Sequence, residues 1–326
     1  MAIQRNAPLP DGLHLCGHRI IKKLASGGFS IVYLARDEAG KVVAIKEYLP
    51  SSLVTRKWGE LVPTIVSENL NDYHVGLKHF FDEGRALARI AHPNVVSVVN
   101  FFRANCTVYM VMAYESGRTL QEHIIHRRER LVRPLVSENF IRNMFGCVMN
   151  GLREVHSNKL LHLDVKPANI FVRRDGSPIL LDFGAARQML KADAANYPIY
   201  TPGFAPPEVY EKIGCLGPWS DIYSVGASMF SCMVGAPPQP ADQRKVNDKM
   251  DTYFEKLEGY YSAPLIEVIR WSLMMDPAKR PHSVFEMQKA LKISYEPAPE
   301  PDDMLTQITQ RVRHFVGFER FRQSAG

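Results

Sequence analysis

The chain has 326 residues, of which 46% are hydrophobic and 23% are charged, and its formal net charge is +6. This is the composition of a folded globular protein with room for one large domain or two lobes, and no stretch approaches the roughly 18 apolar residues of a membrane span. The basic residues are scattered, which argues against a nucleic-acid partner, and the five dispersed cysteines argue for reduced thiols and against a zinc site.

The first half of the chain predicts a small sheet and one helix. The opening stretch, MAIQRNAPLPDG, lacks the apolar run of a signal peptide, so we expect a cytoplasmic protein. Apolar residues recur at helical spacing from Tyr73 to Ile90, after a polar stretch from Pro50 to about Ser67. Apolar, β-branched runs predict five strands, at 18–24, 31–35, 41–49, 94–103 and 107–114.

The second half predicts helices. One long apolar face runs from Val136 to Val155, and further helices fit 220–234, 263–275 and 282–293. The expected fold class is α+β, with a β-rich lobe and a larger helical lobe. The expected parts are an N-terminal extension (1–17), a β-rich lobe (18–115), a helical lobe (116–293), and a linker with an amphipathic tail (294–326).

A polar loop between two apolar runs carries the first chemical signal. In LLHLDVKPANIFV, residues 160–172, an acid, a base and an amide stand at Asp164, Lys166 and Asn169. The Asp can accept the proton of an attacking hydroxyl, the Lys can neutralise phosphate oxygens, and the Asn can bind a metal ion. The spacing predicts a catalytic loop for phosphoryl transfer, to proteins or to small molecules.

A second motif follows shortly afterwards. In PILLDFGAAR, residues 178–187, the sequence DFG comes directly after an apolar strand. Alone, DFG is most often a turn, but this close to the catalytic loop it predicts that Asp182 chelates a Mg²⁺ ion bridging two phosphates.

Upstream, Lys46 in VAIK stands on the predicted strand 41–49, where it would face the α- and β-phosphates. Glu83 stands on the predicted helix. An ion pair between Lys46 and Glu83 would fix the ammonium group in place.

The segment LASGGFSIVY, residues 24–33, occupies the position expected of a phosphate-covering loop. Two of the three glycines of the G-x-G-x-x-G-x-V pattern are replaced, so the motif is weak by itself, and its backbone amides would have to hold the phosphates. The pattern maps onto Ala25, Gly27, Ser30 and Val32, with an extra Gly28.

Together these motifs resemble the eukaryotic-like (Hanks-type) serine/threonine protein kinases of bacteria, over about residues 20–293. Later motifs carry the same resemblance: TPGFAPPE (201–208), GPWSDIYSVGA (217–227) and DPAKRP (276–281). The resemblance implies the bilobal kinase fold, a Glu208–Arg280 pair that anchors the substrate loop, and an Asp221 that holds the catalytic-loop backbone. Lys166 together with Thr201 is the arrangement of Ser/Thr kinases.

The resemblance also implies an adenine pocket and an apolar spine. The pocket would have Val32 and Ala44 above the base, Phe171 below it, Met112 as gatekeeper, and a hinge at Ala113, Tyr114 and Glu115. The spine would stack Leu87, Val98, His162 and Phe183, residues that ordinary core packing explains equally well.

Three features depart from the family pattern. Leu163 stands where many kinases have an Arg that binds a phosphorylated activation segment, and residues 185–200 contain no Ser or Thr. We therefore expect activity without phosphorylation of that segment, unless Leu163 is mere sequence drift.

The second feature is an insertion at 50–75 that precedes the Glu83 helix; it is either a surface loop or a regulatory partner's site. The tail either packs on the helical lobe or binds a partner or a membrane surface.

The sequence therefore predicts a non-specific serine/threonine protein kinase with ATP and Mg²⁺ as cofactors, Mn²⁺ as an alternative metal, and proteins as substrates. Autophosphorylation is compatible with this function. Two alternatives remain: a pseudokinase scaffold that binds nucleotide without catalysis, and a small-molecule phosphotransferase of similar fold.

Overall fold

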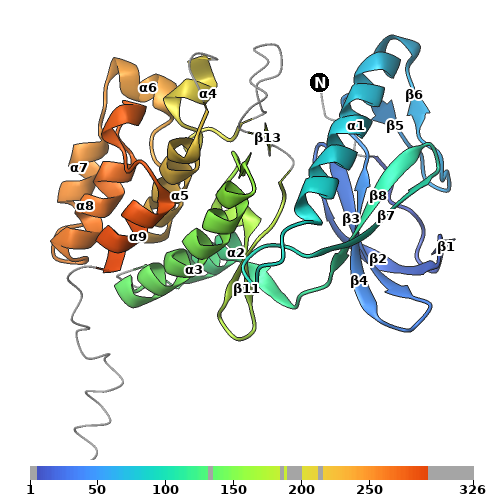
Figure 1. Ribbon diagram of the computed structural model, residues 1–326, viewed down its shortest axis with the longest axis horizontal. Coiled ribbons are helices and arrows are strands. Elements are labelled where there is room, and N and C mark those ends of the chain that lie inside the picture. The colour runs from blue at the N-terminus through green and yellow to red at the C-terminus, as the bar shows by residue number, and fades with distance from the viewer. Residues whose placement is uncertain (1–5, 131–134, 184–186, 189–199, 212–215, 293–326) are drawn as a thin grey trace, which may run out of the picture. The chain divides into compact units, whose positions relative to one another are not determined.

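The computed structural model describes residues 6–130, 135–183, 187–188, 200–211 and 216–292. In this part of the chain, Figure 1 shows one lobe of strands and a single long helix in blue to cyan, and a second lobe of helices in green to red. The predicted α+β, bilobal architecture is confirmed. The predicted tail helix lies outside the described residues, within which no helix has the length and apolar character needed to cross a membrane.

The small lobe is built on a six-stranded antiparallel sheet with strand order β1-β2-β3-β4-β8-β7. All five predicted strands are present, and the short β1 is an addition. The strands are β1 (His14–Leu15), β2 (His18–Ser26), β3 (Ser30–Asp37), β4 (Val42–Tyr48), β7 (Val98–Ala104) and β8 (Thr107–Ala113).

The strand register sorts the side chains onto two faces. Val32 lies opposite Lys46, and Ala44 lies opposite Met112. Opposed residues share a face and successive residues alternate, so the side chains expected to meet nucleotide point to one side of the sheet. The intervening residues point to the other side and are fully buried: Tyr33, Ile45 and Glu47.

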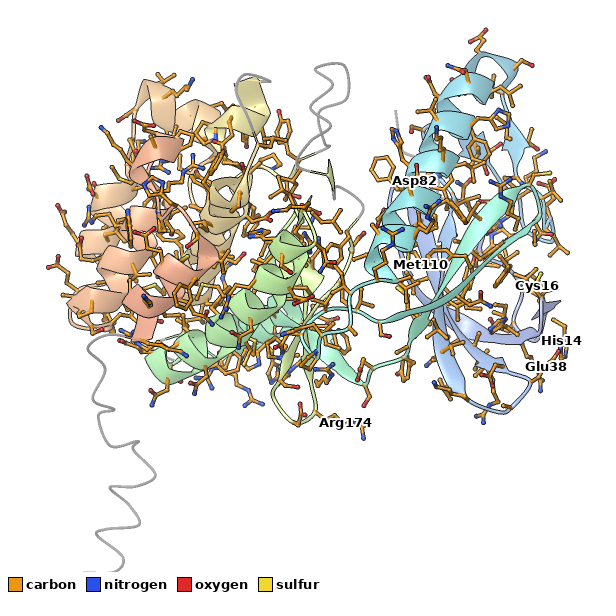
Figure 2. The ribbon with its side chains drawn as sticks, in the orientation of Figure 1. His14, Cys16, Glu38, Asp82, Met110 and Arg174 are labelled. Atoms are coloured by element: carbon orange, nitrogen blue, oxygen red, sulfur yellow. The ribbon has the colours of Figure 1, made fainter. Side chains whose placement is uncertain are left out.

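Helix α1 (Leu70–Leu87) packs on β7 and β8. Its buried residues Tyr73, Phe80, Gly84 and Leu87 follow the predicted spacing, although the helix ends before the expected Ile90. Gly84 allows the close approach, since a Cβ there would lie 2.1 Å from the ring of Phe101 and 2.8 Å from Met110. Figure 2 shows Met110 on β8 beside the C-terminal end of this helix.

The predicted insertion is folded. Strands β5 (Val54–Thr55) and β6 (Thr64–Ile65) pair antiparallel, and the 3-10 turn η1 (Ser67–Asn69) leads into α1, whose first turns belong to the insertion. The N-terminal extension joins it, because Ala7 N–H donates to Arg56 O at 2.9 Å. Leu9, Leu49 and Val54 share a buried apolar cluster with the outer face of the sheet, so extension and insertion together cover that face.

The large lobe surrounds α5, in which every residue from Ser220 to Met233 is buried. The helices predicted in this half are present. The helices are α2 (Leu120–Glu129), α3 (Glu138–Ser157), α4 (Pro207–Glu211), α5 (Pro218–Val234), α6 (Ala241–Val246), α7 (Met250–Glu255), α8 (Ala263–Ser272) and α9 (Val284–Lys292). Short strands frame the polar loop: β9 (Gly117–Thr119), β11 (Ile170–Arg173) and β12 (Pro178–Leu180) form one small sheet, and β10 (Leu160–Leu161) pairs with β13 (Arg187–Gln188).

Candidate active site

The backbone of the predicted catalytic loop is held by a buried carboxylate on α5. Leu163 has a φ of +60°, a left-handed conformation that is strained for a bulky residue. Its N–H donates to Asp221 Oδ1 at 2.7 Å, and the His162 N–H donates to Oδ2 at 2.9 Å. His156 Nε2 lies 2.8 Å from the same Oδ2. Asp221 therefore bonds the backbone of the strained turn.

The charge of Asp221 is stabilised by these contacts. Complete burial by itself would raise the pKa of this carboxyl, but hydrogen bonding and electrostatic attraction from His156 and His162 outweigh burial and lower the pKa below its usual range. The pKa of the His162 imidazole is also lowered, in this case by burial, although the carboxylates of Asp221 and Asp164 act to raise it.

Three other predicted residues converge on the Asp164 carboxylate. Oδ2 accepts from Lys166 Nζ at 2.7 Å and from Asn169 Nδ2 at 2.9 Å, and Oδ1 accepts from Thr201 Oγ1 at 3.0 Å. Lys166 Nζ also donates to Thr201 Oγ1 at 2.7 Å. Asn169, in the 3-10 turn η2 (Pro167–Asn169), additionally donates to the Asp164 carbonyl at 2.9 Å. The side chains of Asp164, Lys166, Asn169 and Thr201, here called the Asp164 cluster, thus form one hydrogen-bonded unit.

Lys46 makes its ion pair with Asp182. Nζ lies 2.6 Å from Asp182 Oδ1, and the Lys46 side chain is only 9% exposed while that of Asp182 is 49% exposed. Asp182 has a φ of +55°, so the carboxylate is presented from a strained backbone position. Burial disfavours the ammonium, but the carboxylates of Asp182 and Glu83 outweigh burial and raise the pKa of Lys46.

The predicted Lys46–Glu83 ion pair is absent: within the part of the chain that the structure describes, Glu83 has neither an ion pair nor a hydrogen bond. Desolvation raises the pKa of Glu83 to about 7, Lys46 lowers it less, and Asp182 raises it further. The predicted pair does not form because Asp182 competes with Glu83 for the Lys46 ammonium and bonds it instead. Glu83 remains close enough to act on Lys46 electrostatically.

The side chains of the predicted spine are brought together. Phe183 is fully buried, and its ring centroid lies 4.3 Å from that of His162. Leu87 and Phe183 belong to one apolar cluster, and Val98 packs against it. His162 Nε2 also lies 3.2 Å from Leu181 O. This packing connects α1 to the loop that carries Asp182.

Two of the residues predicted to enclose the adenine pack against the same apolar cluster as the spine. Met112 and Phe171 are partly buried against the core, and Ala44 is 9% exposed. At the hinge, Ala113 N–H is already bonded to Ser97 O at 3.0 Å. The Glu115 carboxylate pairs with Arg173 at 3.1 Å, so only the backbone of Glu115 would remain to read a base.

The loop expected to cover phosphates, residues 25–30 and here called the nucleotide loop, is exposed at Gly27 and Gly28, and Ser30 is partly buried. Ala25 pairs with Val32 across the β2–β3 hairpin, and Gly27 N–H donates to Ser30 O at 2.9 Å. The loop therefore has the form of a hairpin turn whose tip is accessible from solvent.

The expected Glu208–Arg280 contact is present and buried. Arg280 donates to the two Glu208 oxygens at 2.8 and 3.0 Å, and Ser220 Oγ donates to Oε1 at 2.9 Å. The remaining guanidinium donors reach carbonyls of Met274, Trp219 and Met275. The pair joins the segment after Thr201 to α5 and to the turn before α9.

The site offers oxygen ligands suited to Mg²⁺, an ion that takes one or two protein carboxylates and completes its shell with phosphates and water. Asn169 spends its amide N–H groups on Asp164, which leaves Oδ1 as its metal-binding atom. The Asp182 carboxylate is the second candidate. Within the described ranges no set of three or more His, Cys, Asp or Glu is arranged to hold a metal ion by itself.

Two groups of residues escaped the sequence analysis. His156 comes directly after the apolar face predicted from Val136 to Val155, and its spacing before His162 gives no sign that both contact Asp221. Arg56 and Glu47 form a buried ion pair on the face of the sheet opposite Lys46, and the hydroxyls of Tyr33 and Tyr109 donate to Glu47. A signal existed for this second group: Glu47 interrupts an otherwise apolar run, and a buried carboxylate requires a partner.

Comparisons with known proteins place the chain in a family. The family model described as protein kinase domain matches residues 18–295. The serine/threonine-protein kinase PknA of Nostoc sp. is 26% identical over 296 residues, which cover 86% of this chain and 48% of PknA. The mouse serine/threonine-protein kinase Nek3 is 30% identical over 203 residues, covering 61% of this chain and 39% of Nek3. The chain thus spans half or less of the length of these relatives.

Solved structures show the same fold. The structure titled PpkA-294 apo form superposes with a TM-score of 0.76 at 31% identity, covering 87% of this chain and 99% of that one. The kinase domain of Mycobacterium tuberculosis PknI superposes with a TM-score of 0.64 at 22% identity, a likeness of fold alone. With the family model matching most of its length, the chain belongs to the protein kinase domain family, in the group that resembles bacterial Hanks-type serine/threonine kinases.

Proposed function

We propose that this chain is an active serine/threonine protein kinase, which transfers the γ-phosphoryl group of Mg-ATP to Ser and Thr hydroxyls of protein substrates. The observation that carries the proposal is the Asp164 cluster, in which a carboxylate, an ammonium, an amide and a hydroxyl are already joined at 2.7–3.0 Å. The arrangement supports catalysis because it holds a proton acceptor next to a cation that can neutralise phosphate oxygens.

The roles follow from the contacts. Asp164 would accept the proton of the substrate hydroxyl and orient its oxygen, while Lys166 would neutralise charge on the transferred phosphoryl group. Thr201 ties the substrate loop to Asp164 at 3.0 Å, so the surface that receives the substrate is fixed relative to the base. Catalysis of this kind is mostly positioning and electrostatic stabilisation.

On the nucleotide side, Lys46 would hold the α- and β-phosphates, and Asn169 and Asp182 would hold Mg²⁺, with Mn²⁺ as an alternative. The metal, when bound, neutralises the charge that develops on the phosphate oxygens. Phosphate oxygens would compete with Asp182 for the Lys46 ammonium, and Glu83 is the carboxylate placed to support Lys46 after that exchange. Val32, Ala44, Met112 and Phe171 would enclose the adenine, with the backbone of Ala113 and Glu115 reading its edge.

We further propose a cytoplasmic kinase that acts without phosphorylation of its activation segment. Leu163 is buried and offers no cation to a phosphate. Most of the segment 185–200 lies outside the described residues. Proteins are the proposed substrates and nucleic acid is not. Regulatory partners would act at the insertion (50–75) or at the tail (294–326).

The test is phosphoryl transfer by the purified chain from radiolabelled ATP to a generic protein, followed by identification of the labelled amino acids. Label on Ser and Thr is the expected result. ATP binding without transfer would indicate a pseudokinase, and label confined to small acceptors would indicate a small-molecule phosphotransferase; either result would overturn the proposal.

A further inference from the structure

The chain that leaves β4 stays bonded to the nucleotide loop. The last β3–β4 pair is Ser30 with Tyr48, yet pairing continues beyond it. Leu49 N–H donates to Phe29 O at 2.8 Å, and Ser51 N–H donates to Gly28 O at 2.8 Å. The Ser51 hydroxyl reaches the same Gly28 carbonyl at 3.1 Å. Two carbonyls at the tip of the loop are therefore held, one by Leu49 directly before the insertion and one by Ser51 within it.

The segment that makes these bonds is anchored from behind by Arg56, which is 3% exposed. The guanidinium bonds both oxygens of Glu47, at 2.5 and 2.7 Å, and the Tyr33 hydroxyl at 3.0 Å. Its other donors reach Ala7 O at 2.8 Å and Leu61 O at 3.4 Å. All five donors of this buried cation have partners, which is the condition for a buried ion pair to be well ordered.

The residues that bond Arg56 lie on the same strands as residues predicted to contact the nucleotide. Glu47 follows Lys46 on β4 and points to the opposite face of the sheet. Tyr33, which donates to Glu47 Oε2 at 2.7 Å, follows Val32 on β3. Tyr109 of β8 donates to the other oxygen, Oε1, at 2.8 Å. A displacement of the insertion would thus be resisted by three neighbouring strands at the level of Lys46.

We propose that the insertion is a clamp on the nucleotide loop, with Ser51 as the positioning residue and the Arg56–Glu47 pair as its anchor. The inference rests on the proposed function for its consequence, namely that the loop is ordered before ATP arrives. Pre-ordering reduces the conformational entropy that nucleotide binding must remove, and it suits a loop that has Ala25 and Ser30 in place of two glycines.

The experiment replaces the donor at position 51 in the full chain. Ser51→Pro removes both the N–H and the hydroxyl, while proline suits the second position of the turn that Leu53 N–H closes on Pro50 O at 3.0 Å. We expect the KM for ATP, and the Kd of a non-hydrolysable ATP analogue, to rise about three- to tenfold, the effect of one or two net hydrogen bonds. The kcat and the KM for the protein substrate should stay within about twofold.

Two controls separate positioning from general damage. Ser51→Ala keeps the N–H and should restore most of the ATP affinity, and Ser52→Ala alters the exposed neighbour and should behave as the unsubstituted chain. Unchanged nucleotide affinity in a folded Ser51→Pro protein would overturn the clamp. An unsubstituted chain that neither binds nor transfers would instead overturn the proposed function.

Amide hydrogen exchange on the unsubstituted, nucleotide-free chain keeps the clamp testable if Ser51→Pro does not fold. The amides of Leu49 and Ser51 should exchange as slowly as that of Ile45 within β4. Exchange at Leu49 and Ser51 as fast as at the exposed loop residue Gly28 would overturn the proposal, whatever the activity of the enzyme.

Discussion

The two sides of the active site differ in how completely their charges are paired. On the catalytic-loop side, the Asp164 carboxylate accepts from Lys166, Asn169 and Thr201 at 2.7–3.0 Å. On the nucleotide side, Lys46 is held by Asp182, and Glu83 is left with a pKa of about 7. The difference teaches that the side chains expected to position the substrate hydroxyl are already bonded to one another without a ligand. The side chains expected to bind phosphate are instead bonded to each other in an ion pair, which a bound phosphate would have to replace.

The largest effect should come from breaking the assembled side. Asp164→Asn keeps the shape of the side chain but removes the charge that accepts a proton, so transfer should fall by about 10²- to 10⁴-fold, while nucleotide affinity changes little because Asp164 does not hold ATP. Radiolabel transfer and analogue binding measure the two quantities. The matched control is Asp175→Asn, an exposed acid at the turn between β11 and β12, which should be neutral; equal losses in both proteins would contradict the role of Asp164.

The support beneath the catalytic loop should matter next. Asp221→Ala leaves the N–H groups of His162 and Leu163 buried without an acceptor and removes the partner of His156. We expect the free energy of unfolding to fall by about 3–5 kcal/mol, measured by chemical denaturation. A loss below about 1 kcal/mol would show that Leu163 keeps its left-handed turn without this carboxylate.

Behind the nucleotide side, Arg56→Met leaves the buried Glu47 carboxylate without its cation and should destabilise the chain by about 3 kcal/mol. The double variant Glu47→Met, Arg56→Met removes both charges and should recover part of that loss. If the double variant is no more stable than Arg56→Met alone, the destabilisation arises from lost packing and not from the unpaired charge.

The smallest expected effect concerns Glu83, which is only partly buried and so partly screened by solvent. Its pKa is raised from 4.5 to about 7, so between these values the folded state binds more protons than the unfolded state. Stability should therefore fall as pH rises through this window. Denaturation at about pH 5 and about pH 8 should show a smaller decrease for Glu83→Gln than for the unsubstituted chain; identical decreases would contradict the raised pKa.

The sequence was sufficient for whatever depends on short spacing. Asp164, Lys166 and Asn169 lie within a few residues, so one tight loop between two strands brings them together however the rest of the chain is arranged. The strands were predictable for the same reason, because each is a short apolar, β-branched run that can be recognised from adjacent residues. The Glu208–Arg280 contact joins residues far apart in the chain, and only the family resemblance indicated it.

The choice of partner for Lys46 could not be predicted in the same way. The carboxylates of Asp182 and Glu83 both act electrostatically on the Lys46 ammonium, and only their placement in the folded chain decides which one it bonds. The anchor at Arg56 was missed because its members come from β3, β4, β8 and the insertion, and no periodicity connects them. Glu47 within an apolar run was the local sign that such a partner had to exist.

The most direct test of the difference between the two sides is a structure of the chain with a non-hydrolysable ATP analogue and Mg²⁺. We predict that Lys46 leaves Asp182 for phosphate oxygens, that Asp182 and Asn169 contact the metal, and that the Asp164 cluster keeps its hydrogen bonds of 2.7–3.0 Å. A bound nucleotide with the Lys46–Asp182 pair still closed at 2.6 Å, or with the Asp164 cluster rearranged, would contradict the account.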